Sequence, residues 1–464
     1  MASLRPIIAI CGTTGVGKSK LAVELALRIT EGAVVINADA MQVYEGLDII
    51  TNKLPSEEMM GIPHLLMGYK KPGEQYVVGQ WVEEAARAID GIHDQNKIPI
   101  VVGGTSYWIQ HLIFPDRLIG KGSGSPSTSR PSEDLLSKLT SEERDLFEKL
   151  PDSPQSASTD PDGALAMYKL LQTLDPTVAA RWHWRDTRKV SRSLKIIAET
   201  GRLPSDIIAE QSETDLTARY RTLFFWLYAE PDALNPRLDQ RVDQMLQQGL
   251  LEEVRLLKGL KSPIEQTEGD EKDVVDYTLG IYQSIGYREF DRYVELQNTG
   301  ESQTAYELAV QSMKQSTRRY AKRQVSWIKN KLIPAVLRVN EGSVVGQTTA
   351  IYVLDATEVN DSWDDNVLRV ADKITRDFLD KRSLPNPVEL SPAAKTQLVV
   401  PEKPLRPSDA LARRRKIVCP VCSLDPDRPV MIEEGEQWES HQRTRSHQRL
   451  ARRRSDRQES PELP

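Results

Sequence analysis

Cysteine is the scarcest feature of this 464-residue chain, with only three residues, at positions 11, 419 and 422. So few thiols exclude a disulfide scaffold and favour a reducing compartment. No apolar run reaches the roughly 20 residues needed to cross a bilayer, and the first predicted strand begins at Pro6, which leaves no room for a targeting peptide. We therefore expect a soluble cytoplasmic protein, with the nucleus and the mitochondrion as further compartments left open.

Net charge is also small, because 61 basic and 67 acidic residues leave −6 at pH 7. This balance does not by itself indicate nucleic-acid binding, although a large acidic protein can carry a local basic face. Basic runs do occur near the carboxyl end, at 413–416 and 452–454. A chain of this length can bury a large core and is expected to fold as more than one domain.

Strand and helix patterns alternate over the first hundred residues. Apolar runs predict buried strands at 6–11, 33–39 and 98–104, and helical spacing of apolar residues predicts helices at 18–29 and 81–97. Such alternation predicts a parallel sheet with helices on both faces. The expected fold class is α/β, with a core like that of P-loop NTPases.

The rest of the chain is predicted to be mainly helical. Helical patterns dominate 164–331, most clearly at 235–257, and a strand at 350–356 with a helix at 366–379 returns to the main domain. A low-complexity loop occupies 120–132. We divide the chain into the first part of a P-loop core (1–115), an insertion and helical region (116–235), the rest of the core (236–384), a proline-rich polar linker (385–410) and a small terminal module (411–455).

A phosphate-binding loop directly follows the first strand. Gly12, Gly17, Lys18 and Ser19 satisfy the pattern GxxxxGK[ST] between a strand and a helix. Backbone N–H groups and the positive helix end bind phosphate oxygens, Lys18 adds a charge, and the Ser19 hydroxyl can ligate Mg²⁺. The predicted phosphate-binding residues are Gly12, Thr13, Thr14, Gly15, Val16, Gly17, Lys18 and Ser19.

This motif alone indicates a small-molecule kinase or an NTPase. Such enzymes place an acidic Mg²⁺-positioning residue at the end of an apolar strand, and Asp39 stands at such a position. The third strand is followed by Thr105 and by no carboxylate. This absence argues against ordinary ATP hydrolysis.

A larger set of motifs resembles the tRNA dimethylallyltransferases (isopentenyltransferases). The segment "INADAMQVYEGLDIITNK" (36–53) is similar to the part of these enzymes in which an Asp precedes a small residue and then Met-Gln-Val-Tyr. Further similar segments follow in family order, at 61–68, 101–108, 186–196, 237–254, 280–290 and 317–330. The resemblance implies transfer of the dimethylallyl group from dimethylallyl diphosphate to N6 of adenosine 37, which is 3′-adjacent to the tRNA anticodon.

The resemblance also implies roles for the site residues. An aromatic amine is a poor nucleophile, so the enzyme must orient it, take up its proton and neutralise the departing diphosphate. Asp39 would be the general base and Thr105 would orient the leaving group or the amine. Lys18, Ser19 with Mg²⁺, and Arg241 would carry the diphosphate charge, with Arg237 as the alternative arginine.

Recognition of tRNA is implied for three segments. The target base must be flipped out of the anticodon loop to react. The family's tRNA-contacting positions correspond to Asp39, Ala40, Met41 and Gln42, to Arg188, Lys189 and Arg192, and to Gln283, Ser284, Gly286 and Arg288. Gln42 can read a base edge, the arginines can hold phosphates, and Gly103 and Gly104 would let the backbone approach the ligand.

The terminal module carries a zinc pattern. Cys419 and Cys422 are followed by 18 residues and then by His441 and His447, and four protein ligands indicate a structural Zn²⁺ of the C2H2 type. Eukaryotic members of the family often carry such a finger. We interpret it as an accessory tRNA-binding module that acts by avidity through the linker, with docking of a protein as the alternative.

Two further hypotheses remain open for the whole chain: a P-loop kinase or NTPase, and a non-catalytic RNA-binding protein. Consumption of ATP would favour the first. The main expectation is a monomeric prenyltransferase that uses Mg²⁺, carries a structural Zn²⁺, binds tRNA and dimethylallyl diphosphate, and has no membrane partner.

Overall fold

The computed structural model describes residues 4–115, 131–151, 154–213, 215–260, 280–296, 302–341, 348–358, 362–399, 415–425 and 428–458. The chain divides into two compact units, Met1–Pro115 with Leu216–Glu402, and Asp116–Asp215 with Lys403–Pro464. The predicted loop at 120–132 falls almost wholly outside the described residues, and so does the part of the predicted linker from 400 to 410. No helix in the described ranges is both long enough and apolar enough to span a membrane.

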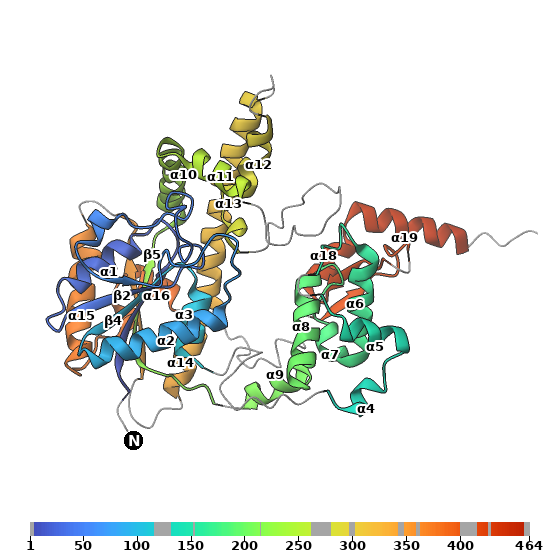
Figure 1. The fold of residues 1–464 in the computed structure, drawn as a ribbon, viewed down its shortest axis with the longest axis horizontal. Coiled ribbons are helices and arrows are strands. Elements are labelled where there is room, and N and C mark those ends of the chain that lie inside the picture. The colour runs from blue at the N-terminus through green and yellow to red at the C-terminus, as the bar shows by residue number, and fades with distance from the viewer. Residues whose placement is uncertain are drawn as a thin grey trace, which may run out of the picture. The chain divides into compact units, whose positions relative to one another are not determined.

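The first unit is built on a six-stranded sheet with the order β3-β2-β4-β1-β5-β6, all of whose pairings are parallel (Figure 1). Its strands are β1 (Pro6–Gly12), β2 (Ala33–Asn37), β3 (His64–Leu65), β4 (Ile98–Val102), β5 (Arg221–Tyr228) and β6 (Thr349–Asp355). The predicted α/β fold with a parallel sheet is therefore confirmed. In such a sheet, ligands bind outside the carboxyl ends of the strands, where the loops after β1, β2 and β4 meet.

The helical elements of this unit follow in chain order. They are α1 (Lys18–Ala26), η1 (Ser56–Met59), α2 (Val78–Asp94), α3 (Ser106–Ile113), α10 (Pro231–Gln247), α11 (Leu250–Gly259), η2 (Gly280–Gln283), α12 (Tyr287–Leu296), α13 (Ser302–Trp327), η3 (Ile328–Leu332), α14 (Ile333–Glu341), η4 (Asp364–Leu368), α15 (Arg369–Leu379), η5 (Pro387–Glu389) and α16 (Pro392–Gln397).

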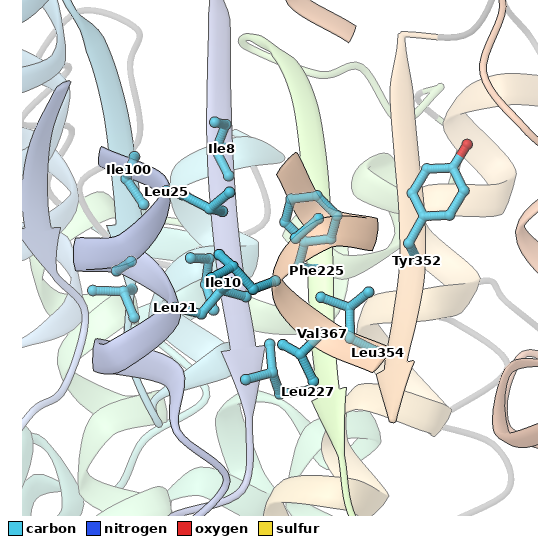
Figure 2. Close-up of a cluster of buried hydrophobic side chains, with 14 of the residues drawn as sticks. Ile8, Ile10, Leu21, Leu25, Ile100, Phe225, Leu227, Tyr352, Leu354 and Val367 are labelled. Atoms are coloured by element: carbon cyan, nitrogen blue, oxygen red, sulfur yellow. The ribbon is translucent and has the colours of Figure 1, made fainter. Parts of the chain in front are cut away.

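Helices cover both faces of the sheet, because alternate residues of each central strand point to opposite faces. Ile8 and Ile10 of β1 pack with Leu21 and Leu25 of α1 on one face, and Val367 of η4 joins the same cluster (Figure 2). On the other face, helices α2, α3 and α14 contact the strands. The strands are buried on both faces, which explains their nearly continuous apolar sequences.

Two features of the core were not predicted from the sequence. The described part of 164–331 is mainly helical, as expected, but it also contains β5, a strand that is buried from Thr222 onward and pairs with β1 and β6. A short, uniformly apolar run has no periodicity that separates a buried strand from a buried helix. The predicted insertion (116–235) therefore includes a strand of the core sheet. The predicted helix at 235–257 is two helices, α10 and α11, separated at Gly249, whose φ is 107°.

The strand and the helix predicted after residue 340 are present and belong to the main domain. The strand β6 and the helical segment η4–α15 join the main domain. The predicted linker, in contrast, is partly structured: α16 contacts β6, and the Tyr352 hydroxyl donates to the Pro385 carbonyl at 2.7 Å. Residues 385–399 thus belong to the first unit.

The second unit combines a helical layer with the terminal module. Its helices are α4 (Glu133–Leu136), α5 (Ser141–Glu148), α6 (Pro161–Leu174), α7 (Pro176–Ala179), α8 (Thr187–Thr200), α9 (Pro204–Glu213), α18 (Glu436–Gln442) and α19 (Arg445–Gln458), with the antiparallel strands β7 (Lys416–Val418) and β8 (Met431–Glu433). The Asp175 carboxylate accepts from the backbone N–H groups of Val178 and Ser205, so one buried side chain caps α7 and fixes the start of α9.

The terminal module packs on this helical layer. Met431 of β8 lies in the same buried cluster as Leu170 and Trp184. The Trp184 indole donates to the Pro429 carbonyl at 2.9 Å, and the Lys416 amide donates to the Ala180 carbonyl at 2.6 Å. Buried apolar contacts therefore join the module to residues far earlier in the chain, a packing that the sequence did not predict.

Candidate active site and metal centre

The phosphate loop connects β1 to α1, as the motif predicted. Its glycines are required by close packing: a Cβ on Gly12 would lie 2.4 Å from the Leu227 carbonyl oxygen, and one on Gly17 would lie 2.7 Å from the Trp363 ring. The Lys18 ammonium donates to the Thr13 carbonyl at 2.7 Å, within the loop. Burial lowers the pKa of Lys18 to about 8, the charge of Asp39 opposes this shift, and that of Arg241 adds to it.

Two polar groups of this site are buried without a hydrogen-bond partner among the residues that the structure describes. They are the Thr13 hydroxyl and the Nε of Arg241. Buried polar groups are normally paired, so an unpaired donor beside a phosphate loop indicates a ligand that supplies acceptor oxygens. The donor set of this loop therefore fits a diphosphate.

The two candidate arginines of α10 have different surroundings. Arg237 donates to three backbone carbonyls, those of Ala233, Ala356 and Thr357. Its guanidinium is thus committed to joining α10 to the end of β6. The charge of Arg241, in contrast, influences the pKa of Lys18. This difference favours Arg241 as the anion-binding arginine.

The neighbouring carboxylates of α10 are paired with α13. Asp239 forms an ion pair with Arg318, and Asp243 forms one with Lys314 at 2.7 Å. The two aspartates therefore bind cations of another helix. Because both aspartates are paired with other cations, neither competes with an anionic ligand for the Arg241 guanidinium on the same helix.

Asp39 and Thr105, the predicted catalytic pair, are brought together after β2 and β4. One carboxylate oxygen of Asp39 accepts from the Met41 amide at 3.0 Å, and the other faces Gly104, whose hypothetical Cβ would lie 3.0 Å from it. The Thr105 hydroxyl accepts from the Ala40 amide at 3.0 Å. The two loops are thus held together by direct hydrogen bonds, and the second oxygen of Asp39 lies beside Gly104.

Two residues of α13, Tyr320 and Gln324, complete this region and were not singled out from the sequence. Burial together with the charge of Asp39 raises the pKa of the Tyr320 hydroxyl well above the usual range, and the neighbouring side chains of Thr105 and Gln324 oppose this shift. Tyr320 therefore stays protonated. The sequence "RRYAKRQ" carries this signal, because Tyr320 and Gln324 are four residues apart and lie on one helix face.

Gly103 and Gly104 have close contacts within the protein. A Cβ on Gly103 would lie 2.1 Å from the Ala38 carbonyl oxygen, and one on Gly104 would lie 2.7 Å from the Gln324 amide nitrogen. Both glycines allow the close approach of other parts of the chain. Their small size is explained by packing within the protein.

The residues near Asp39 that are predicted to bind tRNA are only partly accessible to a ligand. Gln42 is half-buried, and its amide nitrogen donates to the carbonyls of Thr51 and Asn52. Met41 and Ala40 are half-buried, whereas Tyr44 is fully buried and donates to the Glu74 carbonyl. Tyr44 is therefore a core residue, and the donor of Gln42 is already used within the protein.

The remaining tRNA-binding predictions lie on two separate surfaces. In the second unit, Arg188, Lys189 and Arg192 are exposed on α8. In the first unit, Gln283 and Arg288 are exposed beside the start of α12. The other two predicted residues there have internal contacts, since the buried Ser284 hydroxyl donates to the Ile281 carbonyl and the Gly286 amide donates to Glu289.

The four predicted zinc ligands form one cluster. The ligand atoms of Cys419, Cys422, His441 and His447 all lie within 4.8 Å of one another, and both sulfur atoms are 3.5 Å from Nδ1 of His447. Tetrahedral zinc bonds of about 2.0–2.3 Å hold ligand atoms about 3.3–3.8 Å apart. The thiols and imidazoles present therefore fit a structural Zn²⁺.

Comparison with known proteins agrees with this geometry. A model of the IPP transferase family matches residues 42–331. A tRNA dimethylallyltransferase of Schizosaccharomyces pombe is 36% identical, with 98% of this chain and 97% of that protein covered. One of Saccharomyces cerevisiae is also 36% identical, with 96% and 91% covered.

A solved structure of a eukaryotic dimethylallyltransferase acting on tRNA superimposes with a TM-score of 0.74 at 34% identity and covers 98% of both chains. The family model spans more than half of the chain, and the relatives match nearly all of it. The chain therefore belongs to the IPP transferase family.

Proposed function

We propose that this protein transfers the dimethylallyl group of dimethylallyl diphosphate to N6 of the adenosine at position 37 of tRNA. The amine nitrogen forms a bond to C1 of the dimethylallyl group, the C1–O bond breaks, and diphosphate leaves. A proton of the amine passes to the carboxylate of Asp39. The products are N6-isopentenyladenosine in tRNA and diphosphate.

The single observation that carries the proposal is the position of Asp39 and Thr105 beside a phosphate loop with unpaired buried donors. The Asp39 carboxylate uses one oxygen to accept from the Met41 amide, and its other oxygen can accept a proton from an amine. The loop, Lys18 and Arg241 supply the positive charge that a departing diphosphate requires. A kinase would need the same loop and could use Asp39 to position Mg²⁺, but it would not require the pairing of Asp39 with Thr105.

Two metals have proposed sites. The Ser19 hydroxyl, at the start of α1, is suited to hold Mg²⁺, which neutralises diphosphate charge when bound. The cysteine and histidine cluster is suited to hold a structural Zn²⁺. We assign tRNA contact to Asp39–Gln42, to the exposed face of α8 and to the exposed residues Gln283 and Arg288, and we propose a cytoplasmic monomer.

The test is a transfer assay with purified protein, Mg²⁺, bulk tRNA and dimethylallyl diphosphate labelled in the prenyl group. Label should appear in tRNA and co-migrate with N6-isopentenyladenosine after nuclease digestion. Consumption of ATP without transfer would favour the kinase or NTPase alternative. Binding of tRNA without transfer would favour the non-catalytic RNA-binding alternative.

Replacement of Asp39 separates catalysis from binding. We expect Asp39→Ala to lower the transfer rate by about 10²–10⁴-fold, because a positioned general base contributes that much. The affinity for tRNA should change little, since most of it comes from phosphate contacts elsewhere. A filter-binding titration beside the transfer assay measures both quantities, and an unchanged rate would contradict the assignment.

A further inference from the structure

Gln324 of α13 joins the two halves of the candidate active site with one side-chain amide. Its Oε1 accepts from the backbone N–H of Thr14, in the phosphate loop, at 3.0 Å. Its Nε2 donates to the carbonyl of Gly104, next to Thr105, at 2.9 Å. The side chain is only 5% exposed, so neither bond is weakened by competition with water.

The neutral amide can form both bonds, because its oxygen accepts and its nitrogen donates. The contact is also tight, since a Cβ on Gly104 would lie 2.7 Å from the Nε2 atom. Each of the connected backbone groups lies next to residues with a proposed chemical role. Thr14 belongs to the anion-binding loop, and Gly104 lies between the Asp39 carboxylate and the Thr105 hydroxyl.

The helix that carries Gln324 is itself held in place. Arg318 and Lys314 of α13 form ion pairs with Asp239 and Asp243 of α10, the helix that carries Arg241. The helix α13 thus contacts α10 and, through Gln324, both the phosphate loop and the loop that precedes Thr105.

We propose that Gln324 is a positioning residue for the transfer reaction: its amide sets the distance between the loop that holds the diphosphate and the loop that holds Asp39 and Thr105. This inference rests on the proposed function. The physical reason is that the N6 amine of adenosine and the departing diphosphate must lie on opposite sides of C1 of the dimethylallyl group. A displacement of about 1 Å between two such groups can cost about 10²-fold in rate.

The experiment compares Gln324→Met and Gln324→Glu with the wild type. Both side chains have nearly the length of glutamine, so a space-filling role would survive both changes. Methionine loses both hydrogen bonds, and glutamate keeps the acceptor for Thr14 but loses the donor to Gly104. The single-turnover rate at saturating substrates should fall by about tenfold or more in both variants, while the KM for tRNA should stay within about twofold.

Gln315→Met is the matched control, because Gln315 is an exposed glutamine on the same helix. Rates are measured on the folded fraction recovered from gel filtration, so that a loss of stability is not mistaken for a loss of rate. A rate in either Gln324 variant within twofold of the Gln315→Met rate would overturn the inference. Failure of the wild type to transfer at all would instead refute the proposed function.

Discussion

At the scale of single residues, the cations of the candidate active site have different surroundings, and these correspond to different roles. Arg237 is bound by backbone carbonyls, whereas the Nε of Arg241 is buried without a partner among the described residues. Lys18 lies in a site where burial outweighs the nearby carboxylate. These differences separate residues that maintain the fold from residues available to a ligand.

Replacement of the two arginines should therefore have opposite consequences. We expect Arg241→Met to lower kcat/KM for dimethylallyl diphosphate by about 10²–10³-fold, as loss of one charge-stabilising donor does in other active sites, with little loss of stability. Arg237→Met should lower the melting temperature and leave the rate per folded molecule nearly unchanged. Steady-state kinetics with thermal denaturation of both variants measures this, and equal kinetic effects would contradict the assignment.

The lowered pKa of Lys18 predicts a pH dependence of anion binding. The ammonium is charged below a pKa of about 8 and loses its charge as the pH rises through that value. The affinity of the free protein for inorganic diphosphate should therefore fall about fivefold between pH 8 and pH 9, relative to Lys18→Met. Calorimetric titration of both proteins at each pH cancels the ionisation of diphosphate itself, and a constant ratio would contradict the prediction.

At the scale of elements, the late segment β6–η4–α15 supports the phosphate loop. Trp363, at the start of η4, is 3% exposed and packs against Gly17, and its indole donates to Glu24 of α1 at 2.8 Å. A residue near the end of the first unit thereby holds the loop at its beginning. The loop's conformation depends on this packing as well as on its own glycines.

Truncation of this side chain should destabilise the first unit. We expect Trp363→Ala to lower its free energy of unfolding by about 3–5 kcal/mol, the usual cost of removing a buried tryptophan. The affinity for inorganic diphosphate should fall as well, because the loop loses its support. Urea denaturation measures the first effect, and Leu27→Ala, at an exposed residue that ends α1, is the control that should leave both unchanged.

At the scale of the whole molecule, the second unit is a composite of distant sequence segments. The module that carries the cysteine and histidine cluster shares a buried core with α6 and α8 through Met431 and Trp184. We therefore expect a metal bound at the cluster to stabilise the helical layer as well. The basic face of α8 and the basic helix α19 belong to this one unit.

Loss of the metal should therefore affect more than the module itself. We expect Cys419→Ser, or treatment with a chelator, to make α6–α8 sensitive to limited proteolysis and to lower tRNA affinity about tenfold or more. The rate of the chemical step at saturating tRNA should stay within about threefold, because the transfer site lies in the other unit. Mass analysis of the fragments locates the cleavage, and an intact helical layer would contradict the coupling.

Local sequence patterns determined a large part of this protein. Three signals are short-range. They are the glycines and Lys18 of the phosphate loop, the alternation of strands and helices in the first hundred residues, and the spacing of Cys419, Cys422, His441 and His447. Such features can be predicted because a loop or a helix is specified by residues within a few positions of one another.

Contacts between distant segments could be identified only from the tertiary structure. The strand β5 has no periodicity of its own and is identified by pairing with β1 and β6. Gln324 bonds to Thr14 across 310 positions, and Trp184 bonds to Pro429 across 245. The residues around each group do not indicate its partner. Hydrogen bonding and apolar packing depend on proximity in space, which the chain acquires only when it folds.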